Sequence, residues 1–263
     1  MQLRSGLSIS FLVILLLFGG CRQQEQRLTV SAAADLSDAF GEIAEEFRSR
    51  TGVQVSFNFG STGQLAQQIE EGAPVDLFAA ASVDYIDELE RIGRLEAGSR
   101  RRYGKGRLVV WSRPDRRFKI AELADLKNRR IERIAIANPE HAPYGIAAKQ
   151  ALNSAGIWND VSSRLVMAEN VRQALRYGES GDVDAAIVAL SLCHRKMEKG
   201  DQQGQIVIVP EEMHRPLIQE MAIIKGTTQI ELAKVFSELV MSPAGQKILV
   251  KYGFSQVGQE SRP

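Results

Sequence analysis

The segment Phe59-Gly60-Ser61-Thr62-Gly63-Gln64-Leu65 joins a stretch with strand periodicity to a stretch with helical periodicity. Residues 53–59 alternate apolar and polar side chains, whereas Leu65, Ala66 and Ile69 recur at helical spacing. The turn between them has two hydroxyl residues flanked by glycines, and it has no lysine or arginine. Backbone N–H groups and hydroxyls at the positive end of a helix dipole suit an oxyanion. Ordinary helix capping by Ser61 or Thr62 explains the same residues, so the turn alone does not decide between the two.

The same order of strand, turn and helix recurs along the chain. A first strand over 27–31 leads to Asp35, which we expect to be the N-cap of an amphipathic helix ending near Gly52. Further strands are expected at 76–81, 107–112, 133–137, 165–167, 184–190 and 205–210, most of them followed by a helical pattern. Alternating strands and helices with short turns indicate a mostly parallel sheet.

Two changes of direction divide this α/β chain into two lobes. Arg113-Pro114-Asp115 has the composition of a lobe boundary, and the apolar, extended run 216–225 can cross back. The last two helices, at 231–240 and 243–252, would then cover the first lobe. We therefore predict a two-lobed clamshell of two mostly parallel sheets flanked by helices and joined by two crossing strands. The first lobe comprises 28–112 and 217–263, the second comprises 113–216, and a ligand would bind in the cleft between them.

Composition excludes several classes of function. The 263 residues have 33 Lys+Arg and 32 Asp+Glu, a formal charge of +1, so no bulk electrostatic attraction for nucleic acid exists. The three histidines and two cysteines are far apart and have no metal-ligand spacing. The arginines and lysines between 100 and 107 are expected to form a solvated surface loop.

The first 21 residues have the features of a targeting segment. Arg4 precedes an apolar run from Ile9 to Phe18, which is short for a membrane span, and Gly19-Gly20-Cys21 follows it. Small residues before a cysteine resemble a bacterial lipoprotein processing site, with Cys21 as the lipidated residue and 22–27 as a tether. Plain cleavage and release into the periplasm is the alternative. Both alternatives place the folded part outside the cytoplasm. The protein is anchored to the membrane only if Cys21 is lipidated.

Several motifs occur together in one order and spacing. They are Ala32-Ala33-Ala34-Asp35-Leu36, Phe59-Gly60-Ser61-Thr62-Gly63, Gly72-Ala73-Pro74-Val75-Asp76-Leu77-Phe78, Asn138-Pro139-Glu140-His141-Ala142-Pro143-Tyr144-Gly145 and Ala168-Glu169-Asn170-Val171-Arg172. With these motifs the chain resembles the extracytoplasmic molybdate-binding proteins of ABC importers, from about Leu28 to Phe254. The resemblance implies the type II periplasmic-binding-protein fold and a tetrahedral oxyanion held in the cleft by neutral donors.

The resemblance also implies the ligand-binding positions. They match Asp35, Thr62 with Ser61 beside it, Tyr144, and the backbone N–H of Val171. Molybdenum would be held only as molybdate, through its oxygens, with no separate metal site and no cofactor. Ser61 and His141 can instead brace the backbone, and Tyr144 can be a rim aromatic. Some relatives have a tyrosine where this chain has Ala189, so that contact is absent here.

Asp35 departs from the family pattern, in which Ser or Asn is common at this position. An ionised carboxylate can only accept hydrogen bonds, so it cannot donate to an oxyanion. Three interpretations stay open: a helix cap that offers only its backbone N–H, an acceptor for the proton of a protonated oxyanion, or a neutral carboxyl with a raised pKa. The first is favoured because the helix N-terminus stabilises a nearby carboxylate.

The sequence thus predicts a monomeric substrate-binding protein that delivers molybdate or tungstate to an ABC permease. Donors alone favour deprotonated dianions over partly protonated phosphate. A sulfate- or phosphate-type binder is the alternative within this class. A different class is an enzyme acting on a phosphorylated compound, but the cleft supplies only His141 as a base and has no Gly-x-Ser-x-Gly elbow. A lipoprotein with a vestigial cleft is a third alternative.

Overall fold

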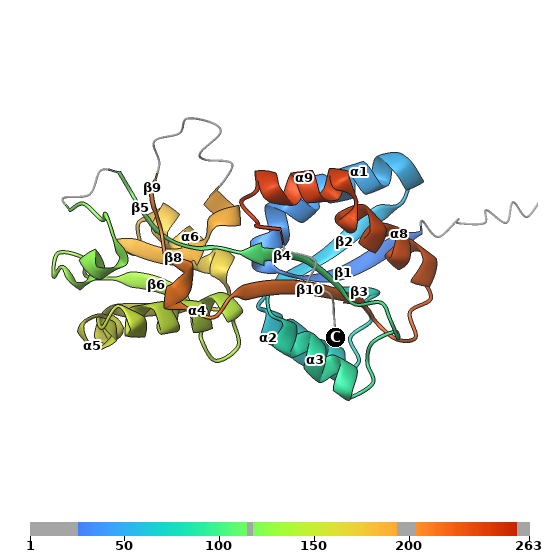
Figure 1. Cartoon of the computed structure of the whole chain (residues 1–263), viewed down its shortest axis with the longest axis horizontal. Helices are drawn as coiled ribbons and strands as arrows, with labels where there is room; N and C mark the ends of the chain where they lie inside the picture. Colours follow the sequence, from blue (N-terminus) through green and yellow to red (C-terminus); the bar gives the residue numbers. More distant parts are fainter. Residues whose placement is uncertain (1–25, 115–117, 194–203, 257–263) are drawn as a thin grey trace, which may run out of the picture.

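A computed structural model describes residues 26–114, 118–193 and 204–256. Two lobes lie side by side, each built on one five-stranded sheet, and two extended connections run between them (Figure 1). The predicted targeting segment, Cys21 and most of the tether lie outside the described residues. Within the described ranges, no helix has both the length and the apolar character needed to cross a membrane.

The first lobe contains the N-terminal and C-terminal segments. Its sheet has the order β2-β1-β3-β10-β4. Helices α1, α8 and α9 lie on one face and α2 and α3 on the other (Figure 1). The bounds are β1 Arg27–Ala33, β2 Gln54–Gly60, β3 Leu77–Ala80, β4 Arg101–Gly106, β10 Leu217–Ile223, α1 Ser37–Thr51, α2 Thr62–Glu70, α3 Val83–Arg91, α8 Ile230–Met241 and α9 Pro243–Lys251, with a 3-10 turn η1 at Ala34–Leu36.

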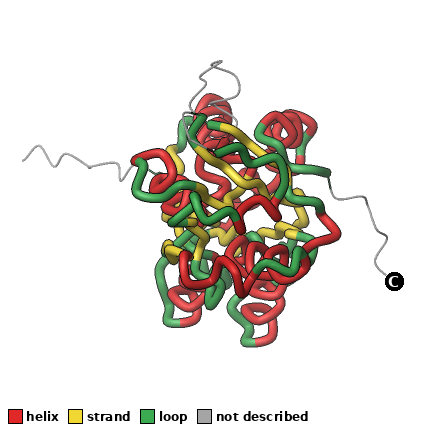
Figure 2. Tube along the Cα trace, turned by 90° about the vertical axis from the view of Figure 1, so that its left-hand side faces the viewer, coloured by secondary structure: helices red, strands yellow, loops and turns green. Residues whose placement is uncertain are grey.

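The second lobe repeats this layering. Its sheet has the order β7-β6-β8-β5-β9, and Figure 2, which views the molecule from this lobe, shows helices on both sides of the strands. The bounds are β5 Leu108–Ser112, β6 Ile134–Ala137, β7 Leu165–Ala168, β8 Ala185–Ala189, β9 Gln205–Ile208, α4 Pro143–Ser154, α5 Trp158–Val161 and α6 Val171–Ser180, with 3-10 turns η2 Leu123–Lys127, η3 Ser162–Arg164, η4 Leu190–Cys193 and η5 Glu211–Met213.

Strand direction differs in part from the expectation of mostly parallel sheets. β1 is parallel to β2 and β3, and β6 is parallel to β7 and β8. β10 is antiparallel to both of its neighbours, and so is β5. The sheets are therefore mixed, because the strands that carry the chain between the lobes enter each sheet against the direction of its βα units.

The first lobe boundary also differs from the predicted one. Leu108–Ser112 was expected to belong to the first lobe, but β5 pairs with β8 and β9 in the second sheet. The chain therefore crosses at Arg107, between β4 and β5, and not at Arg113. The second crossing lies between β9 and β10, where the 216/217 boundary was placed. The composition of residues 113–115 is that of any loop that follows a strand. It therefore does not distinguish a lobe boundary from an ordinary loop.

The basic cluster is only in part the solvated loop that its composition indicated, since Arg101 and Arg102 are exposed but lie on a strand. Residues 101–106 form β4, and the side chain of Arg100 is only 11% exposed. Its guanidinium pairs with Asp87, Glu90 and the buried carboxylate of Glu220 at 2.5–2.6 Å. A buried carboxylate needs such a partner, so this arginine serves the buried Glu220 and is not a freely solvated charge.

The two lobes contact each other directly at the loop before α4. The carbonyl oxygen of His141 accepts hydrogen bonds from three groups of the first lobe: the Ser61 hydroxyl at 2.7 Å, the Gly63 amide at 2.9 Å and the Tyr85 hydroxyl at 3.3 Å. At the other end of the interface, Arg172 on α6 pairs with Asp38 on α1 at 3.2 Å. These contacts hold the lobes together on both sides of the space between them.

Gly63 is required for this contact, because a β-carbon there would lie 2.6 Å from the His141 carbonyl oxygen and 2.9 Å from the Tyr85 hydroxyl. We expect Gly63→Ala to keep the lobes apart and to give a larger radius of gyration in small-angle X-ray scattering. The control is Gly41→Ala, where a β-carbon in the middle of α1 meets nothing within 4 Å. It should leave the radius unchanged and add about 0.5–1 kcal/mol to stability. An unchanged radius for Gly63→Ala would contradict this role.

Candidate functional site

Four helical segments begin around one small cavity between the lobes. The cavity has a volume of about 10 Å³. It lies at the starts of η1, α2, α4 and α6, so the positive ends of the helix dipoles converge on it. All five predicted binding residues are on its wall. The lining residues are Ala33, Ala34, Asp35, Gly60, Ser61, Thr62, Ala81, Ala142, Pro143, Tyr144, Asn170 and Val171.

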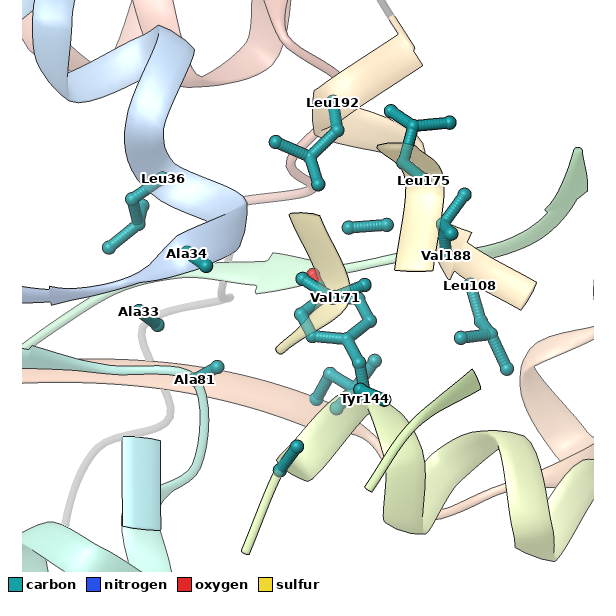
Figure 3. Packing of buried hydrophobic residues seen from close by; sticks show 14 of the residues in the cluster. Ala33, Ala34, Leu36, Ala81, Leu108, Tyr144, Val171, Leu175, Val188 and Leu192 are labelled. Carbon is teal, nitrogen blue, oxygen red and sulfur yellow. The ribbon is translucent and has the colours of Figure 1, made fainter. Parts of the chain in front are cut away.

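The wall contains residues from both lobes. Figure 3 shows Ala33, Ala34 and Ala81 on the first-lobe side, facing Tyr144 and Val171 from the second lobe. Alanine and glycine next to the helix starts allow a ligand to approach the backbone closely. The five predicted residues are at most 4% exposed, so a ligand held by them would be removed from water.

Thr62 is the first residue of α2 and is 1% exposed. Its Oγ1 accepts the amide of Ala81 at 3.1 Å. A hydroxyl that accepts in this way keeps its own proton for donation. Thr62 can therefore donate one hydrogen bond to an anion in the cavity, and the Ala81 amide fixes the direction of the hydroxyl.

Val171 is the first residue of α6, and its side chain packs in the core. The side chain of Asn170 caps this helix by accepting the amides of Arg172 at 3.1 Å and Gln173 at 3.0 Å. The amide of Val171 precedes both and has no acceptor within its own helix. The cap thus leaves a backbone donor at the cavity, as the prediction for Val171 requires.

The hydroxyl of Ser61 is engaged with the opposite lobe. It donates to the carbonyl oxygen of His141 and lies 2.8 Å from Nδ1 of the same residue. A serine hydroxyl has one proton, so this arrangement does not leave it free for an anion. The geometry favours the interpretation of Ser61 and His141 as bracing residues.

The side chains of Asp35 and Tyr144 are bonded to each other. The Tyr144 hydroxyl donates to Oδ2 of Asp35 at 2.9 Å, and Nε2 of Gln219 donates to the same oxygen at 2.5 Å. The backbone carbonyl of Asp35 accepts the hydroxyl of Ser191 at 2.8 Å. Asp35 therefore connects the first lobe to α4 and η4 of the second, with β10 behind it.

Asp35 is not the helix cap that the sequence suggested. It lies inside the 3-10 turn η1, and no side-chain cap bond is present at the start of η1 or of α1. Its carboxylate turns instead to Tyr144 and Gln219. Its Oδ1 is buried and has no hydrogen-bond partner among the described residues.

Burial raises the pKa of Asp35 from 3.8 to about 6, although the hydrogen bonds from Gln219 and Tyr144 act in the opposite direction. Burial also raises the pKa of Tyr144 and of Tyr103 well above the usual value, and the charge of Asp35 adds to both shifts. Both tyrosines are therefore neutral and serve as hydrogen-bond donors. Tyr103 donates to Gln219 at 2.9 Å and so orients the amide that holds Asp35.

Sequence reasoning missed Gln219, Ser191 and Tyr103. A signal existed for Gln219, because Gln219-Glu220 is a polar pair inside an apolar strand, and both residues are fully buried. Buried polar side chains need partners, so such a pair marks a site or an ion pair. Ser191 and Tyr103 had no comparable signal, since their contacts depend on how the lobes are placed.

The chemistry of the cavity is that of an anion site without a cation. No Lys, Arg or His is among its lining residues, and the described residues contain no cluster of His, Cys, Asp and Glu that could hold a metal ion. A second cavity of about 420 Å³ adjoins it and shares Ala34 and Asn170. Arg172 and Arg176 line that outer cavity, with Asp38 and Glu169 among the acids.

Comparison with known proteins identifies the family of this chain. The sequence profile of the bacterial extracellular solute-binding proteins matches residues 28–255. The chain belongs to this family. It is thus a solute-binding protein that acts outside the cytoplasm, and not an enzyme.

The similarity to individual relatives covers nearly the whole chain. The molybdate-binding protein ModA of Azotobacter vinelandii is 32% identical over 250 residues, covering 94% of this chain and 98% of the relative. ModA of Escherichia coli K12 is 32% identical over 260 residues, covering 97% of each. The solved structure of the Azotobacter vinelandii periplasmic molybdate-binding protein superposes with a TM-score of 0.81, at 29% identity, covering 88% of this chain and 99% of that one.

The raised pKa of Asp35 predicts an effect of pH on stability. The folded protein holds this proton up to about pH 6, whereas the unfolded chain releases it near 3.8, so stability falls by up to about 3 kcal/mol between pH 4 and 7. Asp35→Asn removes this loss and keeps an oxygen acceptor for Tyr144 and Gln219. In urea unfolding it should be more stable than the wild type at pH 8, with a difference that shrinks towards pH 4.

The control is Asp38→Asn, which removes a carboxylate that pairs with Arg172 and should lower stability at pH 8. Equal stability of Asp35→Asn and the wild type at pH 8, or a difference that grows as the pH falls, would contradict the assigned pKa.

Proposed function

We propose that this protein binds molybdate or tungstate between its lobes and delivers it to a membrane permease of an ABC importer. The observation that carries the proposal is the cavity at which four helical segments begin without any cationic side chain on the wall. Neutral N–H and O–H donors are suited to a fully deprotonated dianion, because such an anion presents only acceptors. No cofactor is needed.

Relatives support this ligand. The relatives from Azotobacter vinelandii and Escherichia coli are molybdate-binding proteins, and each match covers more than nine-tenths of this chain. A relative in Bacillus subtilis, 29% identical over 258 residues, is assigned as an ABC transporter substrate-binding lipoprotein. It supports both the transport role and lipidation of Cys21, which would anchor this chain at the membrane on the periplasmic side. The monomer is the simplest state for such a protein, and we propose it here.

The mechanism is binding by closure. A dianion would first bind to the Thr62 hydroxyl on the first lobe. Closure of the second lobe would then bring the amide of Val171 to the same anion. The contacts of the His141 carbonyl with Ser61 and Gly63 join the two lobes, so they would stabilise the closed, liganded form. A permease can then distinguish the closed form from the open one.

Phosphate is a second candidate, and the observation that favours it is the buried carboxylate of Asp35 with one unpartnered oxygen. A carboxylate can accept the proton of hydrogen phosphate, which a site of donors alone cannot do. Sulfate fits the neutral donors as well as molybdate does, so these two anions differ mainly in size.

Titration calorimetry of the purified protein with molybdate, tungstate, sulfate and phosphate tests the proposal. We expect tight binding of molybdate and tungstate and a weak response to the other two. Thr62→Val removes one hydrogen bond to the anion, worth about 1.5–3 kcal/mol, so affinity should fall roughly 10- to 150-fold. Thr62→Ser keeps the hydroxyl and should retain most of the affinity.

A preference for phosphate would show that phosphate, and not molybdate or tungstate, is the ligand. An absence of binding with all four anions would overturn the proposed function. An unchanged affinity of Thr62→Val would remove Thr62 from the site.

A further inference from the structure

Asp35 poses a chemical conflict within the proposed site. Its carboxylate is on the wall of the cavity and is 1% exposed, yet both a carboxylate and an oxyanion only accept hydrogen bonds. Oδ2 already accepts two hydrogen bonds, from Tyr144 and Gln219. Oδ1 is buried and has no partner among the described residues. Two negative groups in one desolvated space repel each other strongly unless one of them is neutralised.

No neighbouring cation resolves the conflict. The basic groups on the elements around Asp35 are paired with acids: Arg172 with Asp38, Arg100 with Glu220, and Arg107 with Glu211 at 3.8 Å. The titratable and charged groups on the elements around Asp35 are Tyr144 on α4, Tyr103 on β4, Glu220 on β10, Asp38 on α1, Arg172 on α6 and His141 before α4. None of them is hydrogen-bonded to Asp35 as a cation.

We infer that the protein takes up one proton with its anion: the carboxylate of Asp35 is protonated at Oδ1 when a deprotonated oxyanion enters the cavity. This inference rests on the proposed function. The proton comes from the solvent, one O–H bond forms on the carboxyl group, and no bond of the anion breaks. The new hydroxyl converts an unpartnered side-chain acceptor on the wall into a donor that can bond to an anion oxygen.

The other contacts of Asp35 are compatible with this protonation. Oδ2 remains an acceptor for Tyr144 and Gln219, so the connection between the lobes does not change. Burial has already raised the pKa of Asp35 to about 6, and a dianion nearby would raise it further. At neutral pH the free protein is then mostly ionised at Asp35 and the bound protein is neutral there.

Proton uptake can be counted by calorimetry. Molybdate is titrated into the full-length protein at pH 8 in buffers with different enthalpies of ionisation, and affinity is measured from pH 6 to 9, where molybdate stays a dianion. We expect about one proton taken up per molybdate at pH 8. The affinity should fall roughly tenfold per pH unit above pH 7, as linkage to one proton requires.

Asp35→Asn should bind without proton uptake and with an affinity independent of pH, because the amide cannot titrate. Asp38→Asn is the matched control, since it removes a carboxylate at the edge of the cleft and should keep the uptake of one proton. Infrared difference spectra of the wild type give a second readout that needs no variant. Adding molybdate at pH 8 should produce the carbonyl band of a protonated carboxylic acid.

Molybdate binding without proton uptake in the wild type, or without the carboxylic acid band, would overturn the inference and leave the proposed function intact. Equal proton uptake in Asp35→Asn and the wild type would also overturn it. An absence of binding of molybdate, tungstate, sulfate and phosphate by the wild type would overturn the proposed function and this inference together.

Discussion

The hydrogen bond between Tyr144 and Asp35 is the interaction on which the geometry of the cleft depends. It joins the start of α4 to the first turn after β1, and so it joins the two lobes at the wall of the cavity. Gln219 adds a bond from the strand that returns the chain to the first lobe, and Ser191 adds one to the backbone of Asp35. The position of Asp35 is thus determined by both lobes and by one connection between them.

The burial of this hydrogen-bond network fixes the position of Asp35, but it also has a cost in free energy. An ionised carboxylate removed from water is unfavourable, and the raised pKa of Asp35 expresses that cost. Four helical segments that begin around the cavity supply positive potential without a side-chain charge. A site of this kind avoids the desolvation cost of a buried lysine or arginine, and it can hold an anion through short polar groups and backbone amides.

Much of the architecture followed from periodicity and turn residues. The alternation of strands and helices, the two lobes and the turn at residues 60–63 were predictable because hydrophobic spacing and glycine placement act locally. The lobe boundary was placed wrongly, because β5 joins the second sheet through pairing with β8, which local sequence does not encode. The five predicted binding residues share one cavity, but their side-chain contacts were not predictable. Asp35 turns from its own helix to Tyr144 and Gln219, which are more than 100 positions away in sequence.

A crystal structure of the protein with tungstate would show whether neutral donors or charged side chains hold the anion, because the heavy atom locates the anion without ambiguity. We predict one tungstate in the inner cavity, within hydrogen-bond distance of the Thr62 hydroxyl and the Val171 amide, with no lysine or arginine in contact with it. A tungstate bound instead in the outer cavity beside Arg172 and Arg176 would contradict this prediction, and would show that side-chain charge rather than neutral donors holds the anion.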